Sequence, residues 1–215
     1  MTSEFIGTLG GAGVIPVIVI EREEQAVPLA KALAKGGLPV LEVTFRTAAA
    51  AGAIAAIRRE VPEAVLGAGT LLTPQMVKDA KAAGAVFGVA PGFDPVVMAA
   101  AKAEGLPMCP GIATASELSQ ALTAGCTMVK FFPAEAAGGV KMIKNLLGAF
   151  RFTGVRFMPT GGVNLSNVAD YLSVPEIVCC GGTWIVPKDA LAANDWAAIE
   201  KLAADAAALV RKLRG

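Results

Sequence analysis

The feature that most limits the possible folds is a regular alternation of short apolar runs with alanine-rich segments of helical pattern. The short runs are apolar at consecutive positions, which is typical of parallel strands covered on both faces. The expected strands are Ile15–Ile20, Val40–Phe45, Ala64–Gly67, Ala85–Ala90, Pro107–Pro110, Thr127–Phe131, Val155–Met158 and Glu176–Cys180. Helical patterns lie near residues 22–36, 47–60, 74–83, 94–104, 115–124, 137–147, 165–172 and 195–213.

Eight strand–helix units in succession predict a closed (β/α)8 barrel, the TIM-barrel form of the α/β class, rather than an open doubly wound sheet. The length of 215 residues fits this fold, because α/β barrels commonly form one domain of about 200–250 residues. We therefore expect residues 1–215 to form a single barrel domain, in which residues 1–13 are an N-terminal extension or helix. Thr73-Pro74 and Thr114-x-x-Glu117 are helix-start signals, and Gly84 is a helix stop.

Composition excludes several classes of partner. The 54% content of hydrophobic residues is sufficient for a large core, and 19 basic against 18 acidic residues leave no field that would attract nucleic acid. No apolar stretch is long enough to span a membrane, and the start of the sequence lacks the pattern of a signal peptide. We expect free, buried thiols and a cytoplasmic location from the four cysteines, Cys109, Cys126, Cys179 and Cys180.

The chain contains no histidine. This absence excludes histidine-dependent acid–base catalysis, the serine and cysteine triads, and histidine-rich catalytic metal sites. Proton transfer near neutral pH has to use glutamate, aspartate, lysine, tyrosine or water.

Lys130 is the only one of the eleven lysines that lies inside an apolar strand pattern. Burial disfavours the charged form of a lysine, and an uncharged amine in an apolar pocket can attack a ketone carbon to form an imine. The alternative is a structural lysine that extends from the strand end to solvent or pairs with a carboxylate. The pattern of polar residues on other strands favours the nucleophile.

Glu42 is the corresponding exception in the strand Val40–Phe45, because a lone buried carboxylate is costly. Glu42, Thr44 and Arg46 alternate along the chain, so in an extended strand all three point to one side, toward Lys130. Glu42 could then act as a general acid and base, or form only a structural ion pair with Lys130. Arg46 could hold a carboxylate, or be a surface charge at a helix start.

Polar and glycine-rich segments follow several expected strands, at the end where barrels carry their active sites. Thr70 follows Gly67-Ala68-Gly69 and offers a hydroxyl donor. Two glycine pairs, Gly161-Gly162 and Gly181-Gly182, end the last two expected strands, and Thr183 follows the second pair. Barrels commonly build a phosphate site there from backbone N–H groups, although the glycines could also serve only as tight turns.

Together these motifs resemble the 2-keto-3-deoxy-6-phosphogluconate (KDPG) and 4-hydroxy-2-oxoglutarate aldolase family. The resemblance runs from about Val14 to the C-terminus and keeps the motifs in order. They are Leu41-Glu42-Val43-Thr44-Phe45-Arg46-Thr47, Gly67-Ala68-Gly69-Thr70, Val129-Lys130-Phe131-Phe132-Pro133-Ala134-Glu135, Pro159-Thr160-Gly161-Gly162 and Gly181-Gly182-Thr183-Trp184.

The resemblance implies a role for each matching residue. Lys130 matches the Schiff-base lysine and Glu42 the general acid/base. The other matches are Arg46 and Thr70 for the substrate carboxylate, Pro91 and Phe132 for pocket walls, and Gly161, Gly162, Gly182 and Thr183 for the phosphate. Some relatives also carry an arginine late in the first strand, where this chain has Val17-Ile18-Val19-Ile20. The resemblance further implies a homotrimer that uses no metal or cofactor.

The implied function is cleavage of KDPG to pyruvate and glyceraldehyde 3-phosphate, and of 4-hydroxy-2-oxoglutarate to pyruvate and glyoxylate. One alternative is an aldolase for the galactonate-derived epimer; from the resemblance, Thr160 in the pocket favours the gluconate isomer. A second alternative is a sugar-phosphate epimerase on the same barrel. A third is a phosphate-ligand-binding barrel without turnover.

Overall fold

The computed structural model describes residues 1–214 and has the α/β fold expected from the sequence. The strands are β1 (Val14–Ile18), β2 (Val40–Thr44), β3 (Val65–Gly69), β4 (Phe87–Val89), β5 (Met108–Cys109), β6 (Gly111–Ile112), β7 (Met128–Phe131), β8 (Arg156–Pro159) and β9 (Cys180–Gly182). The helices are α1 (Ser3–Ala12), α2 (Ala26–Lys35), α3 (Ala50–Glu60), α4 (Pro74–Ala83), α5 (Pro95–Ala103), α6 (Ala115–Thr123), α7 (Gly139–Phe150), α8 (Val168–Leu172), α9 (Lys188–Ala192) and α10 (Trp196–Arg214), with 3-10 turns η1 (Glu23–Gln25) and η2 (Arg151–Thr153).

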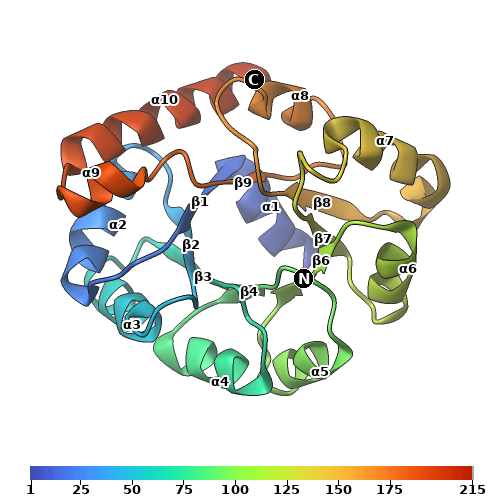
Figure 1. Ribbon diagram of the computed structural model, residues 1–215, viewed down its shortest axis with the longest axis horizontal. Coiled ribbons are helices and arrows are strands. Elements are labelled where there is room, and N and C mark those ends of the chain that lie inside the picture. The colour runs from blue at the N-terminus through green and yellow to red at the C-terminus, as the bar shows by residue number, and fades with distance from the viewer. Residues whose placement is uncertain (215) are drawn as a thin grey trace.

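All the paired strands are parallel and form two curled sheets. One sheet has the order β5-β4-β3-β2-β1-β9 and the other the order β6-β7-β8. Isolated bridges join Phe157 to Ile177 and Thr160 to Gly181, next to β8 and β9. Only Pro110 separates β5 from β6. In Figure 1 the strands lie at the centre, and the helices from α2 to α10 surround them.

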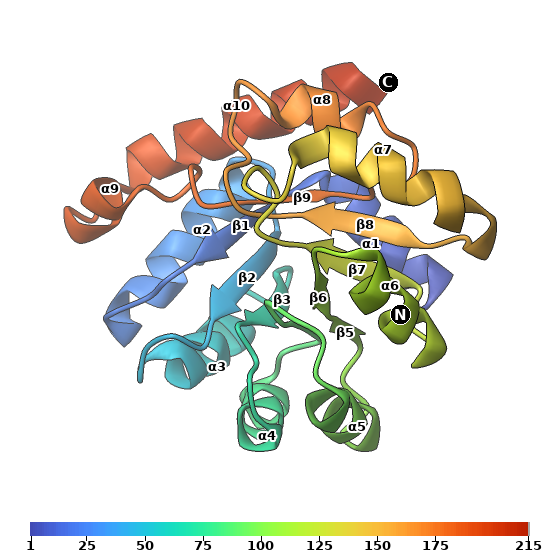
Figure 2. The ribbon, with the colours of Figure 1, turned by 45° about the vertical axis from the view of Figure 1, so that its right-hand side comes forward.

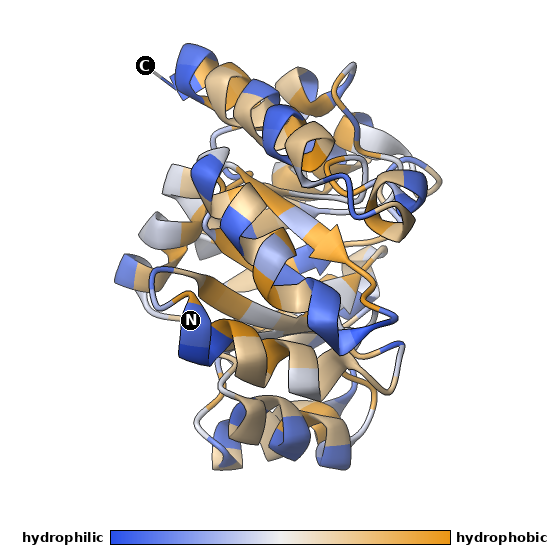
Figure 3. Ribbon diagram, turned by 90° about the vertical axis from the view of Figure 1, so that its left-hand side faces the viewer, coloured by the Kyte–Doolittle hydropathy of each residue, from blue (hydrophilic) through white to orange (hydrophobic). Residues whose placement is uncertain are grey.

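The core has an outer and an inner part. The outer part packs the helices against the strands through residues such as Leu29, Leu33 and Ile57. The inner part gathers alternate strand residues, among them Val40 and Met128, together with Leu9 of α1. Helix α1 therefore covers the amino-terminal end of the strands and leaves their carboxyl ends open for a site. Figure 2 shows α1 behind the strands, and Figure 3 shows hydrophilic and hydrophobic residues side by side on the surrounding helices.

The helix signals in the sequence have their expected effect. Thr73 caps α4 by accepting a hydrogen bond from the Met76 amide, and Gly84 ends the helix with a φ of 102°. Thr114 and Glu117 form the predicted capping box at the start of α6. These caps fix where each helix leaves the strand before it, and so they position the loops at the carboxyl ends of the strands.

The strand predictions need two corrections. The last strand is Cys180–Gly182 and not Glu176–Cys180, because β9 pairs with β1 through its glycines, with Gly181 opposite Ile15. The fifth expected strand, Pro107–Pro110, is divided into β5 and β6, because Pro110 has no N–H to continue the ladder.

Helix α9 was not anticipated. It lies between the last expected strand and the last expected helix, in a stretch that the sequence pattern left unassigned. Its short length of 5 residues explains this omission, because so short a helix has no complete hydrophobic period.

Candidate active site

Lys130 and Glu42 lie together on the inner face of the curled sheets. The Lys130 Nζ is 3.5 Å from the Glu42 Oε1, and the two side chains are 5% and 0% exposed. Each residue stands two positions after a member of the inner core, Val40 on β2 and Met128 on β7. The alternation of side chains along a strand thus brings both to the inner face, one layer nearer the carboxyl ends.

The Glu42 carboxylate has no stabilising polar contact in the described chain other than the ion pair with Lys130. Neither of its oxygens accepts a hydrogen bond within residues 1–214, and the buried Thr160 hydroxyl is also unpartnered there. Buried polar groups in proteins are nearly always hydrogen-bonded, and a buried ion pair is a weak source of stability. Unsatisfied oxygen atoms beside a buried amine are therefore better explained by a reacting molecule than by folding.

Two glycines give these side chains their space. A Cβ on Gly69 would lie 2.2 Å from the Glu42 Oε1, and a Cβ on Gly181 would lie 2.3 Å from the Thr160 Oγ1. Any larger residue would displace the carboxylate or the hydroxyl. Gly69 thus leaves room for the Glu42 side chain, and Gly181 leaves room for the Thr160 side chain. This need for space explains why a glycine stands at position 181 within strand β9.

Arg46 and Thr70 meet at the rim of the site. Strand β2 ends at Thr44, so Arg46 lies in the turn that follows and is exposed, whereas Glu42 and Thr44 are fully buried. The Arg46 Nε donates to the Thr70 Oγ1 at 3.1 Å. Thr70 has a φ of 60°, a strained conformation for a β-branched residue. The strained turn directs the hydroxyl to the guanidinium, as expected if both hold one ligand group.

Phe132 and Pro91 border the buried pair. The Lys130 Nζ lies 5.3 Å from the centre of the Phe132 ring. Lys130 pairs in register with Gly111 of β6, and a Cβ on Gly111 would lie 2.1 Å from the Pro91 carbonyl oxygen. The backbone at Pro91 therefore approaches the strand next to Lys130.

Gly161 and Gly162 form the turn after β8 with φ values of 97° and 82°, conformations that favour glycine. Asn164 and Asn167, which the sequence analysis did not single out, each donate to the Gly162 carbonyl at 3.1 Å. The Asn side chains hold this turn in place. Their signal in the sequence was the spacing Asn-x-x-Asn that begins two residues after Gly162, a pattern typical of side-chain-bonded turns.

The second glycine pair was expected after the last strand, but Gly181 and Gly182 lie within β9. Gly182 is packed so closely against Trp184 that a Cβ would lie 1.9 Å from its ring. Thr183 is the first residue beyond the strand, and it is exposed. Thr183 therefore lies just beyond the last strand, whereas Gly182 lies within it.

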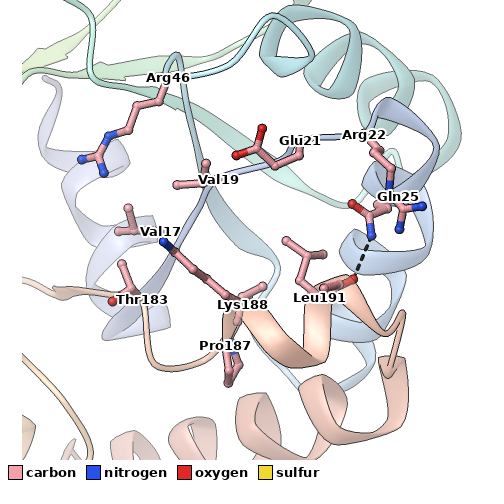
Figure 4. A pocket seen from close by; sticks show the side chains of 12 residues that line it. Val17, Val19, Glu21, Arg22, Gln25, Arg46, Thr183, Pro187, Lys188 and Leu191 are labelled. Carbon is pink, nitrogen blue, oxygen red and sulfur yellow. Dashed lines mark hydrogen bonds between the residues drawn. The ribbon is translucent and has the colours of Figure 1, made fainter.

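A cavity of about 840 Å³ opens beside these residues (Figure 4). Arg46 and Thr183 line it, whereas Lys130 and Glu42 do not. The remaining lining comes from β1 and the residues after it up to η1, and from α9 with the segment before it, namely Val17, Val19, Glu21, Arg22, Gln25, Val186, Pro187, Lys188, Leu191 and Ala192. Two predicted binding residues thus share one open cavity.

Other ionisable side chains nearby are poor competitors of Lys130 and Glu42. Burial raises the pKa of the Cys109 thiol well above its usual value, while the charges of Lys130 and Glu42 act on it in opposite directions. Burial and the hydrogen bond to Glu135 raise the pKa of Tyr171. Both groups remain protonated at neutral pH, so the thiol is no nucleophile there and the phenol is no base.

Within residues 1–214, no group of three or more histidine, cysteine, aspartate or glutamate side chains is arranged to hold a metal ion. No helix in this part of the chain is both long and apolar enough to cross a membrane.

The comparisons with known proteins agree with this geometry. The family model described as KDPG and KHG aldolase matches residues 6–202. The chain is 51% identical over 189 residues to a 2-dehydro-3-deoxy-phosphogluconate aldolase of Treponema pallidum, covering 88% of this chain and 89% of that protein. It is 50% identical over 193 residues to a KHG/KDPG aldolase of Escherichia coli K12, covering 90% of each.

A solved structure gives the same result. The KDPG aldolase of Legionella pneumophila, with pyruvate captured as a covalent carbinolamine intermediate, superposes with a TM-score of 0.88 and 44% identity, over 93% of this chain and 96% of that one. The chain has an α/β fold of parallel strands and a lysine and a glutamate buried side by side. Together with the similarity to the Legionella enzyme, these features define an aldolase, a carbon–carbon lyase. The chain belongs to the KDPG and KHG aldolase family.

Proposed function

We propose that this protein is a class I aldolase that cleaves KDPG to pyruvate and glyceraldehyde 3-phosphate through an imine on Lys130. The observation that carries the proposal is the buried pair of Lys130 and Glu42 at 3.5 Å, with carboxylate oxygens that accept no hydrogen bond in residues 1–214. The names of the relatives support the substrate, and the captured pyruvate of the Legionella enzyme supports a covalent mechanism.

In the proposed reaction, the uncharged Lys130 amine attacks C2 of the keto acid and forms a carbinolamine, which loses water to give an iminium ion. A base removes the proton of the C4 hydroxyl group. The C3–C4 bond then breaks, its electron pair moves to the iminium nitrogen, and glyceraldehyde 3-phosphate leaves as the aldehyde. The remaining enamine takes up a proton at C3, and water hydrolyses the imine to release pyruvate and the free amine.

Glu42 is the proposed acid and base in these steps. It is the carboxylate beside Lys130, and its oxygens have no other hydrogen bonds to break within residues 1–214. One carboxylate can accept the proton of the carbinolamine or of the C4 hydroxyl group and return it to the enamine carbon. The close approach over Gly69 holds it in position for both transfers.

The other residues would bind the substrate. Arg46 and Thr70 would hold the carboxylate next to the imine, since a guanidinium and a hydroxyl group converge there. The pocket walls would come from Pro91, Phe132 and Thr160, and the phosphate site from Gly161, Gly162, Gly182 and Thr183. Thr160 has an unpartnered hydroxyl group within the described chain and could bind a substrate oxygen atom.

The same site would also cleave 4-hydroxy-2-oxoglutarate, which shares the 2-keto and 4-hydroxy groups on which the mechanism acts. The E. coli relative is named for both substrates. Neither substrate needs a metal ion or a cofactor in this mechanism, because the iminium ion serves as the electron sink.

Borohydride trapping tests the proposal. Incubation with pyruvate and borohydride should attach one reduced pyruvate to Lys130, detectable by peptide mass spectrometry. Lys130→Ala should abolish both labelling and turnover. Pyruvate release from KDPG, its galactonate epimer and 4-hydroxy-2-oxoglutarate should be measured side by side, with KDPG expected to be the best substrate. A protein that turns over substrate without pyruvate labelling would instead support epimerase-type acid–base chemistry.

We further propose that the two sheets close into one (β/α)8 barrel that forms a single domain over residues 1–215. Support comes from the bridges between the β8 and β9 regions and from Pro110 as the sole residue between β5 and β6. In this arrangement β5 and β6 count as one interrupted strand.

The proposed assembly is a homotrimer, and the proposed compartment is the cytoplasm. Leu72 and Val96, which are 51% and 61% exposed, support an interface between copies. The four cysteines are buried and free, which is compatible with a reducing compartment. Sedimentation velocity would test the trimer directly.

A further inference from the structure

Lys188 enters the open cavity from the segment that follows β9. The cavity is bounded by Val17 and Val19 at the end of β1 on one side and by Thr183 on another. In Figure 4 the Lys188 side chain extends across the cavity in the direction of Val17 and Thr183, with Arg46 farther along the same wall. The amine therefore points toward Val17 and Thr183, inside a cavity that Arg46 also lines.

The charge of the cavity favours an anion. Its lining has three cationic side chains, Arg22, Arg46 and Lys188, and one carboxylate, Glu21. Arg22 is engaged with Glu24 at 3.7 Å and with Asn194 at 3.4 Å, and Arg46 donates to Thr70. Lys188 makes no ion pair and no side-chain hydrogen bond within residues 1–214, so its charge is free to meet a ligand.

The backbone that carries Lys188 is fixed to the 3-10 turn η1, which follows β1. The Gln25 amide, which is 4% exposed, donates to the Leu191 carbonyl and to the Asn194 Oδ1, both at 2.8 Å. Val186 and Leu191, on either side of Lys188, are buried. The loop after β1 and helix α9 are thus joined across the cavity, and only the flexible lysine side chain has to adjust to a ligand.

We propose that the Lys188 amine binds the phosphate at the distal end of the substrate, together with the Thr183 hydroxyl group. This inference rests on the proposed function, which places the keto end of the substrate at Lys130 and Arg46. A phosphate on C6 lies beyond the reacting carbons, in the direction of the cavity past Thr183. Lys188 then supplies the cation that the apolar end of β1 does not, and it favours the phosphorylated substrate over the shorter 4-hydroxy-2-oxoglutarate.

Steady-state kinetics of Lys188→Met on both substrates test this assignment. Loss of a charge-assisted hydrogen bond at a partly exposed site should raise KM for KDPG roughly 10-fold. We expect kcat for KDPG and both constants for 4-hydroxy-2-oxoglutarate to change little. Lys188→Arg should restore most of the affinity for KDPG. Lys78→Met, on α4 and outside the cavity, is the matched control and should behave as the unchanged protein.

A second readout does not depend on turnover. Trp184 lies next to Thr183, so its fluorescence should report binding of inorganic phosphate, and Lys188→Met should weaken that binding by a similar factor. Equal effects on the two substrates, or unaltered phosphate binding and KM in Lys188→Met, would overturn the role of Lys188. A parent protein that binds phosphate through Lys188 but cleaves neither substrate would instead overturn the proposed function and leave the anion site standing.

Discussion

At the scale of single residues, Glu42 and Glu176 show how alike a reactive and a structural carboxylate are in sequence. Both are buried, and both lie beside a cation: Glu42 with Lys130, and Glu176 with Arg151 at 2.7 Å. One oxygen of Glu176 accepts a hydrogen bond from Arg151, an exposed side chain, and only its other oxygen is unpartnered, whereas neither oxygen of Glu42 accepts one within the described chain. The difference lies in hydrogen bonding, which only coordinates reveal.

Glu42→Gln should lower kcat for KDPG by roughly 10²–10⁴-fold, the usual contribution of a general acid–base group. Glutamine keeps the shape of the side chain but cannot exchange a proton, so the protein should fold and still be labelled slowly by pyruvate and borohydride. Stopped assays of pyruvate release give the measurement. Glu176→Gln is the control, with kcat unchanged; near-normal turnover in Glu42→Gln would remove the assigned role.

The site could be predicted from sequence only where a residue conflicts with its local pattern. Lys130 and Glu42 interrupt apolar strands, and so the cost of burying them was visible in the sequence. Lys188 follows a proline at the start of a short helix, where a lysine is ordinary. Its place in the cavity depends on how Gln25 anchors helix α9, a contact between residues 166 or more positions apart.

At the scale of elements, the strands richest in β-branched and large apolar residues were the most predictable. Strand β2 is the expected run without its last residue, Phe45. Strand β9 has the sequence Cys180-Gly181-Gly182, and glycine has a low β-strand propensity. Glycine is needed there because a larger residue would collide with Thr160 or Trp184. A hydrophobic pattern predicts a strand from the side chains of the strand itself. It cannot predict a strand such as β9, whose glycines are required by the side chains of neighbouring residues.

The capping box of α6 gives a prediction about pH. Hydrogen bonds from the Ala113 amide, at 2.8 Å, and from Thr114 lower the pKa of Glu117. A lowered pKa in the folded state means that the charged carboxylate stabilises the fold above the unfolded value near pH 4.3, and that this stabilisation is lost as the pH falls through the folded value.

Glu117→Gln should therefore lower the free energy of unfolding at pH 7 by about 0.5 kcal/mol, a small value because the site is partly exposed to solvent. The deficit should shrink as the pH falls below the unfolded value and disappear only once the pH is below the lowered pKa of the folded state, where the wild-type carboxyl is also neutral. Urea unfolding of both proteins at the two pH values provides the measurement. A deficit of equal size under both conditions would mean that the charge of Glu117 does not contribute.

At the scale of the whole molecule, the two ends of the helical layer meet where α10 packs on α2. Gly36, directly after α2, lies so close to α10 that a Cβ would be 2.5 Å from the Ala203 Cβ and 2.7 Å from the Glu200 carbonyl oxygen. Lys35 and Glu200 form an ion pair at 3.0 Å across the same junction. The last helix can therefore pack this closely on the end of α2 only because position 36 has no side chain.

Gly36→Ala should lower the free energy of unfolding by about 1–3 kcal/mol, the usual cost of forcing an extra methyl group into a packed contact. Gly148→Ala in α7, where a Cβ would meet nothing within 4 Å, is the matched control and should raise it by about 0.5–1 kcal/mol through helix propensity. Urea unfolding followed by circular dichroism measures both, and kcat should stay unchanged in each.

If the strands close into one barrel, both variants should unfold in a single transition, because loosening the α2–α10 junction then weakens the entire ring. A second transition confined to Gly36→Ala would show that the two sheets unfold separately and would contradict the closed barrel.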